Sequence, residues 1–174
     1  MVESGNFTWP LPFWKQPGHR WTGMMDAGVR AAFQCSSRAA SIMLPQRDGL
    51  IVNISFWAAQ KYIGNVIYGI AKAATDKMTH EMAQELLLSG ITAVSLYPGL
   101  VRTESVLEAA RAGWLDLSNS ESPEFIGRVI AGLYRDPNRA ARTGRVLIAA
   151  ALAHEYGIAD TDGARPVPLN LESV

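Results

Sequence analysis

Three short apolar runs stand out from the surrounding pattern and are typical of β-strands. They cover residues 50–54, 91–96 and 144–149, and glycine, proline or polar turn residues lie close to each run. The first two are nearly continuous in apolar and β-branched residues, which favours strands buried inside a sheet.

Longer segments around these strands carry apolar residues at helical spacing. They cover residues 21–44, 66–88 and 123–134. Pro45 ends the first of these helices, and Ser89 with Gly90 ends the second. Strands separated by helices of this length indicate right-handed βαβ crossovers. The sequence therefore predicts an α/β fold with a parallel sheet.

Composition and charge narrow the range of partners. The chain has 174 residues, of which 48% are hydrophobic and 18% are charged, so one globular domain with a core is expected. Sixteen basic and sixteen acidic residues give a formal net charge of zero, which argues against a nucleic-acid partner. A single cysteine, Cys35, fits a reducing cytoplasm, and we find neither a secretion signal nor a membrane span. We expect a small molecule or another protein chain as the partner.

Several polar residues are predicted to meet at one rim of the sheet. Ser55 directly follows the first strand, and Pro98 with Gly99 follows the second. Tyr68 and Lys72 fall in the first turns of the helix between these strands. Because the carboxyl ends of parallel strands share one edge, where ligands bind in such sheets, these groups form a candidate site.

Tyr68 and Lys72 lie four positions apart, so a helix places their Cβ atoms on one face at about 5–6 Å. An ammonium so close to a phenol favours phenolate and is expected to lower the tyrosine pKa. Such a tyrosine could exchange a proton with a substrate oxygen that Ser55 holds in place. The pair alone is more often found on an amphipathic helix with a surface lysine, and Ser55 could simply end a strand.

The ordered set of motifs resembles the active-site segment of short-chain dehydrogenases/reductases. In that family a strand ends in Asn-x-Ser, Tyr-x-x-x-Lys follows, and a later strand leads into Pro-Gly-x-x-x-Thr. Here the motifs read Asn53-Ile-Ser55, Tyr68-Gly-Ile-Ala-Lys72 and Pro98-Gly99-Leu-Val-Arg-Thr103. The resemblance covers roughly residues 21–150, and residues 156–163 are most similar to one mammalian subgroup.

The resemblance implies an oxidoreductase that moves hydride between NAD or NADP and an alcohol or carbonyl substrate. It implies Tyr68 as the general acid/base, Ser55 as the residue that orients the substrate oxygen, and Lys72 as a residue that lowers the tyrosine pKa and binds the nicotinamide ribose. The residues implied against the nicotinamide and its carboxamide are Pro98, Gly99, Val101 and Thr103. Thr103 is also placed to cap a helix over residues 104–111.

Two departures from the family pattern affect the expected activity. The family's helix asparagine, which anchors a water in the proton relay, falls where this chain has Gly28, although Asp26 or a backbone carbonyl could hold that water. The sequence also contains no Thr-Gly-x-x-x-Gly-x-Gly turn, which in the family holds the cofactor pyrophosphate. Cofactor binding by these 174 residues alone is therefore in doubt.

The expected organisation is a single incomplete Rossmann-like domain over residues 1–174. It would be the C-terminal part of a doubly wound parallel sheet, with about three strands and their flanking helices. We divide it into a lead-in loop (1–20), a catalytic segment (21–150) and a C-terminal tail (151–174).

Two further functions stay open at this point. The first is a catalytically silent relative that acts as a binding or oligomerisation module. Helices 21–44 and 66–88 resemble the pair that forms a four-helix bundle between subunits of the family, so we expect a homo-oligomer. The second, a serine hydrolase using Ser55, lacks a Gly-x-Ser-x-Gly elbow and a placed histidine.

The remaining candidates for chemistry are histidines and tryptophans. His19, His80 and His154 share no metal-ligand spacing, so no metal site is expected. Trp9, Trp14 and Trp57 fit either a substrate mouth or simple loop packing.

Overall fold

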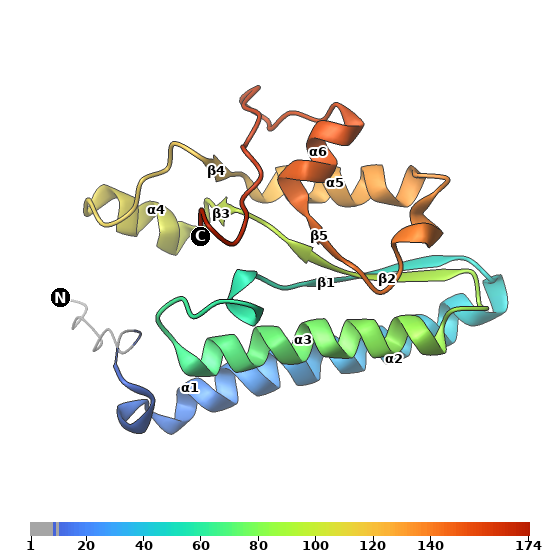
Figure 1. Cartoon of the computed structure of the whole chain (residues 1–174), viewed down its shortest axis with the longest axis horizontal. Helices are drawn as coiled ribbons and strands as arrows, with labels where there is room; N and C mark the ends of the chain where they lie inside the picture. Colours follow the sequence, from blue (N-terminus) through green and yellow to red (C-terminus); the bar gives the residue numbers. More distant parts are fainter. Residues whose placement is uncertain (1–8, 10) are drawn as a thin grey trace.

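The computed structural model describes Trp9 and residues 11–174, arranged as a sheet between two layers of helices. Helices α2 (Ala31–Met43) and α3 (Val66–Glu85) cover one face of the sheet, and α5 (Pro123–Arg135) and α6 (Ala149–Tyr156) lie on the other (Figure 1). The predicted lead-in loop falls partly outside the described residues.

The main sheet has three parallel strands, as the sequence predicts. Strands β1 (Gly49–Ile54), β2 (Ile91–Tyr97) and β5 (Val146–Ile148) follow the order β1-β2-β5. Asn53 pairs with Ser95, and Tyr97 pairs with Ile148, so the carboxyl ends of the strands lie together. In the part of the chain that the structure describes, β1 forms an edge of this sheet.

The first predicted helix begins earlier and is less regular than expected. It runs through α1 (Gly18–Thr22), a π-helical stretch η2 (Gly23–Arg30), α2 and a 3₁₀ turn η3 (Leu44–Gln46). A further 3₁₀ turn, η1 (Phe13–Lys15), lies within the expected loop. The prediction of a start at residue 21 is therefore wrong, because Pro17 precedes the first helical residue and sets an extended backbone just before it.

Helix α3 ends at Glu85, three residues before the predicted end. Asn65 caps its start through a hydrogen bond from the Tyr68 amide (3.0 Å). Residues 86–90 form turns, and Leu88 is 85% exposed. Leu86 is buried in the core, whereas Leu87 and Leu88 extend the apolar pattern in the sequence and are exposed.

The core on the second face explains α6, which the sequence did not predict. Its buried side chains come from β2, β5, α5 and α6: Val94, Leu96, Phe125, Val129, Leu133, Leu147, Ala149, Leu152 and Ala153. The third strand ends at Ile148, and Ala149 already begins α6. A continuous apolar run thus contains both a strand and a helix, and its pattern does not separate them.

An insert follows β2 and leads away from the main sheet. It contains β3 (Leu100–Val101), α4 (Glu104–Arg111) and β4 (Ser120–Glu121), and β3 pairs with β4 in parallel. The chain also forms 3₁₀ turns η4 (Trp57–Ala59) and η5 (Arg139–Arg142).

Candidate active site

Ser55 and Lys72 are joined at the end of β1. The Ser55 amide donates to the Leu96 carbonyl (2.9 Å), which extends the β1–β2 pairing by one bond. The buried Ser55 hydroxyl donates to the Lys72 carbonyl (3.2 Å), and Lys72 Nζ donates to the Ile54 carbonyl (3.2 Å). These bonds fix the carboxyl end of β1 against the first turns of α3, as the predicted site requires.

Tyr68 lies between Lys72 and two aromatic rings. Lys72 Nζ is 5.5 Å from the centroid of the Tyr68 ring. The ring centroids of Trp9 and Phe56 lie 5.1 and 6.5 Å from that of Tyr68. Asn65 holds this arrangement, because it caps the Tyr68 amide while its Nδ2 donates to the Trp9 carbonyl (3.0 Å).

The electrostatics of the pair differ from the sequence expectation. Burial raises the pKa of the Tyr68 phenol above its ordinary value, where the spacing argument expected a lower one. Burial also lowers the pKa of Lys72, and the negative charge of Asp76 opposes that effect. The physical reason is that desolvation disfavours both charged forms, phenolate and ammonium. In the chain by itself, Tyr68 is a phenol at neutral pH.

A cavity of about 270 Å³ opens beside this pair. Tyr68 and Lys72 lie on one side, and Gly28 lies on the other within η2. A Cβ atom placed on Gly28 would meet nothing within 4 Å, so the glycine leaves space at the position where the family has asparagine. Ser55 and residues 98–103 are not part of the lining.

Residues 98–103 occupy the start of the insert. The Gly99 amide donates to Glu121 Oε2 (2.9 Å), and Val101 belongs to β3. Thr103 caps α4 by accepting from the Val106 amide (3.4 Å), which confirms the capping prediction. These bonds lie within the insert, and contact of residues 98–103 with a cofactor stays a prediction.

A second polar group lies beneath the site and was missed from the sequence. The Tyr97 hydroxyl donates to Asp76 Oδ2, and Gln60 Nε2 donates to the Tyr97 hydroxyl (3.2 Å). Burial and the Asp76 carboxylate raise the pKa of Tyr97 far above its ordinary value. Asp76 is the residue from which this group could have been predicted, because it lies four positions after Lys72 and therefore on the same face of α3.

The tryptophans separate into three environments. Trp57 is buried with its ring 5.2 Å from that of Tyr97, which supports the packing interpretation. Trp9 contacts Tyr68, and Trp14 is exposed.

The described residues offer neither a clustered metal site nor a membrane-spanning helix. No group of three or more histidine, cysteine or acidic side chains among them could hold a metal ion. None of their helices combines the length and apolar character that a bilayer crossing requires.

The chain, whose parallel sheet has Tyr68 and Lys72 near its carboxyl rim, belongs to the short-chain dehydrogenase family. The family model described as short chain dehydrogenase matches residues 1–112. The chain is 38% identical over 175 aligned residues to the human protein named dehydrogenase/reductase SDR family member 1. That alignment covers 93% of this chain and 56% of the human protein, so the chain spans little more than half of its relative.

Solved structures support the same assignment. An acetoin dehydrogenase from Enterobacter cloacae is 29% identical, with a TM-score of 0.64 over 79% of this chain and 56% of that one. A structure described as ElxO with NADP bound has a TM-score of 0.69 at 21% identity, over 79% of this chain and 59% of that one, and shows the fold alone.

Proposed function

We propose that this chain carries the proton-transfer and nicotinamide-binding part of an NAD(P)-dependent oxidoreductase that acts on an alcohol or carbonyl. The observation that carries the proposal is the joint placement of Tyr68 and Lys72 on one cavity, with Ser55 bonded to the same helix. The family and the names of the relatives support this class of reaction.

The described residues fit one end of a nicotinamide cofactor. The cavity beside Lys72 measures about 270 Å³. That is below the roughly 300–1,000 Å³ typical of pockets for drug-sized ligands, so it suits a ribose or nicotinamide better than a whole dinucleotide. The Lys72 ammonium and the Tyr68 hydroxyl are the groups that would bind the ribose there. Residues 98–103 do not line this cavity and would face the nicotinamide from outside it.

Proton transfer would centre on Tyr68. When bound, the nicotinamide supplies or accepts the hydride at the substrate carbon. Burial raises the Tyr68 pKa, so at neutral pH the phenol carries a proton that it can donate to a carbonyl oxygen during reduction. For the reverse reaction, the Lys72 charge would help the phenolate to form. Ser55 would turn its hydroxyl from the Lys72 carbonyl toward the substrate oxygen and hold that oxygen near Tyr68.

The experiment replaces Tyr68 by phenylalanine in the chain joined in frame to a dinucleotide-binding segment that carries the glycine-rich turn. Reduction of a panel of small aldehydes and ketones is followed with NADH and NADPH. We expect Tyr68→Phe to lower kcat by at least about 100-fold, the usual size of a general acid contribution. Thermal unfolding should change little, because only one hydroxyl is removed.

Tyr62→Phe is the matched control, because it makes the same chemical change at a tyrosine that is 72% exposed. The control should turn over like the parent protein. Turnover retained by Tyr68→Phe would refute the role of Tyr68 as the acid/base.

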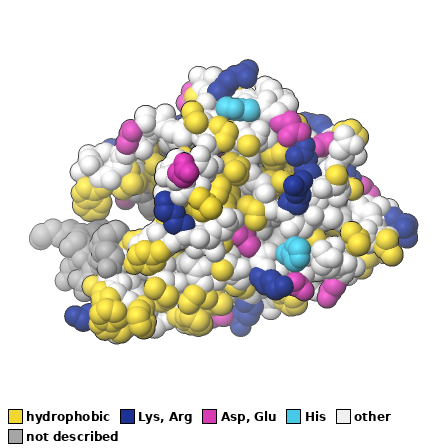
Figure 2. All heavy atoms as spheres, viewed as in Figure 1, with side chains coloured by type: hydrophobic (Ala, Val, Ile, Leu, Met, Phe, Trp, Pro, Cys, Tyr) yellow, Lys and Arg dark blue, Asp and Glu magenta, His cyan; other side chains and the backbone are white. Residues whose placement is uncertain are grey.

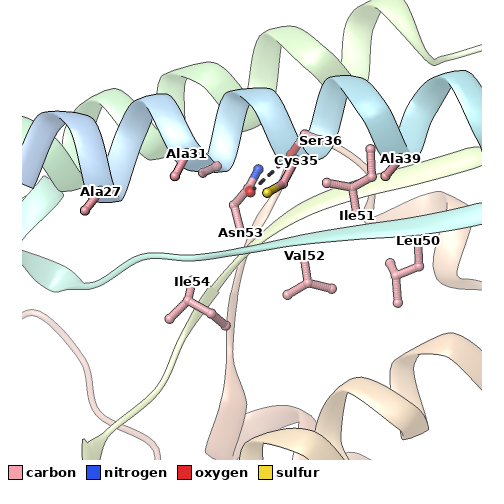
Figure 3. A pocket seen from close by; sticks show the side chains of 12 residues that line it. Ala27, Ala31, Cys35, Ser36, Ala39, Leu50, Ile51, Val52, Asn53 and Ile54 are labelled. Carbon is pink, nitrogen blue, oxygen red and sulfur yellow. Dashed lines mark hydrogen bonds between the residues drawn. The ribbon is translucent and has the colours of Figure 1, made fainter.

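A binding or oligomerisation module is the second candidate, and it is favoured by the edge position of β1 in the sheet that the described residues form. A pocket of about 480 Å³ lies between α2 and β1, with Cys35 and Ser36 on the helix and Asn53 on the strand (Figure 3). Ser36 Oγ donates to Asn53 Oδ1 across it (3.4 Å). Concentration-dependent association without any turnover that depends on Tyr68 would favour this candidate.

A further inference from the structure

A fully buried carboxylate lies outside the candidate active site and outside the residues that the family model matches. The side chain of Asp160 has 0% exposed surface. It accepts hydrogen bonds from the amides of Ser122 (2.8 Å) and Thr161 (2.6 Å) and from the Ser122 hydroxyl. Arg102 Nη2 forms an ion pair with it at 2.9 Å. This many donors compensate the cost of burying the Asp160 charge and fix its position in the fold.

Asp160 connects the two ends of the insert. Arg102 follows β3, and Ser122 follows β4. The Arg102 amide donates to the Glu121 carbonyl (2.8 Å), and its Nη1 donates to the Ser120 carbonyl (3.2 Å). The C-terminal part of the chain passes beside β3 (Figure 1). The Asp160 carboxylate therefore holds together Arg102, where the insert leaves the main fold, and Ser122, where the chain returns to it; we call this arrangement the clamp.

The same strand pair holds Gly99. Val101 pairs with Glu121, whose buried carboxylate accepts from the Gly99 amide (2.9 Å). A Cβ atom on Gly99 would lie 2.9 Å from Glu121 Oε1, so the loop and the carboxylate are in close contact. The backbone of residues 98–103 is thus fixed by β4, and β4 is fixed by Asp160.

Apart from this base, two hydrogen bonds between Asn119 and Val167 join the insert to the C-terminal segment. All eight residues of α4 are described, and none of them is buried. Trp114 in the following loop is 72% exposed. Because the insert buries so little of its own surface, the geometry of residues 98–103 depends on the bonds at the β3–β4 pair.

We propose that Asp160 is a positioning residue that holds residues 98–103 in the shape that receives the nicotinamide end of the cofactor. Asp160 acts through Arg102 and Ser122 and does not touch the cofactor. The cofactor part of this inference rests on the proposed function, whereas the clamp itself does not.

The experiment compares Asp160→Asn with Asp162→Asn in the full chain. Asp162 is a matched control, because it also contacts Arg102 Nη2 (3.3 Å) but is 54% exposed. Amide hydrogen exchange measures the clamp. We expect Asp160→Asn to accelerate exchange at least tenfold at the amides of Arg102 and Ser122, with β1, β2 and α3 unchanged. The control should leave all of these rates unchanged.

Binding of reduced nicotinamide mononucleotide measures positioning, because this ligand lacks the adenosine part of the dinucleotide. Its fluorescence is followed at millimolar concentrations. We expect Asp160→Asn to raise the dissociation constant of the mononucleotide at least tenfold and to reduce the emission shift of the bound nicotinamide. Arg102→Gln, at a partly exposed position, should have the same effects and serves if Asp160→Asn does not fold.

The outcomes separate the clamp from the function. Unchanged exchange in both Asp160→Asn and Arg102→Gln would overturn the clamp. Faster exchange with unchanged mononucleotide binding, or with no binding by the parent chain, would overturn the positioning role. Loss of the proposed function alone would appear as normal mononucleotide binding with turnover that does not depend on Tyr68.

Discussion

The Asn65 side chain joins the first turn of α3 to the N-terminal segment, and its removal gives a sharp test of how Tyr68 is held. Its Oδ1 accepts from the Tyr68 amide (3.0 Å), and its Nδ2 donates to the Trp9 carbonyl (3.0 Å). Only 2% of the residue is exposed, so water does not replace either bond easily. Asn65→Ala removes both bonds at once.

The cost follows from these two bonds. Loss of an N-cap destabilises a protein by about 1 kcal/mol. Loss of the bond to the Trp9 carbonyl adds about 1 kcal/mol. We therefore expect Asn65→Ala to lower the free energy of unfolding by about 2 kcal/mol. For a chain of this size that corresponds to a fall in Tm of about 4–8 °C.

Urea unfolding and thermal unfolding, both followed by circular dichroism, measure this change. Asn65→Ser keeps a capping oxygen but cannot reach the Trp9 carbonyl, so we expect about half of the loss. Thr103→Ala removes a more exposed and longer cap bond (3.4 Å) and should cost about 0.5 kcal/mol. If Asn65→Ala costs no more than Thr103→Ala, the two bonds of Asn65 do not support α3 as described.

Three further predictions follow from the charges, the sequence and the surface. Burial raises the pKa of Glu121, so its contribution to stability is present below the unfolded pKa of 4.5 and is lost as pH rises through the folded pKa. Glu121→Gln should therefore raise Tm at pH 7 and leave it unchanged below pH 4.5. Equal Tm values for the variant and the parent chain at pH 7 would contradict this. Calorimetric titration of the 174-residue chain with micromolar NADH or NADPH should show little or no binding, because the sequence has no Thr-Gly-x-x-x-Gly-x-Gly turn. A micromolar Kd would refute this reasoning. Light scattering should show species larger than the 18.9 kDa monomer, and Phe33→Glu on the exposed face of α2 should reduce this self-association. A monodisperse monomer would contradict the predicted oligomer.

The surface supports the last of these predictions. Hydrophobic side chains gather over the α1 end of the molecule, at the lower left of Figure 2. Exposed apolar residues on the two helices proposed for the interface include Phe33, Ile42 and Ile70. An interface between copies through residues 21–44 and 66–88 stays a proposal.

The main strands could be predicted because each requires a continuous apolar run to be buried between helices. Residues 50–54 and 91–96 each lie within an observed strand, and their parallel pairing is confirmed. Strands β3 and β4 could not be found in this way, since each has only two residues and depends on bonds from Arg102 and Glu121. Such bonds join positions that are distant in the sequence.

The same limit applies to the site. The spacing of Tyr68 and Lys72 correctly placed both on one face of α3, and the structure adds that both line one cavity. It gave the wrong direction for the Tyr68 pKa in the chain alone, because Trp9 and Phe56 bring the burial from outside the helix. Asp160 lies 58 positions from Arg102, and local spacing gives no sign of their contact.

The π-helical stretch Gly23–Arg30 also sets the phase between the two ends of the long N-terminal helix. An α-helix turns by about 100° for each residue, so inserting or deleting one residue in this helix without a compensating change in its winding would rotate one end against the other by about that angle. Because Ser36 and Asn53 tie α2 to the sheet, the rotation would fall on the N-terminal end and carry Trp9 away from the Tyr68 ring. This segment should therefore tolerate substitutions far better than insertions or deletions.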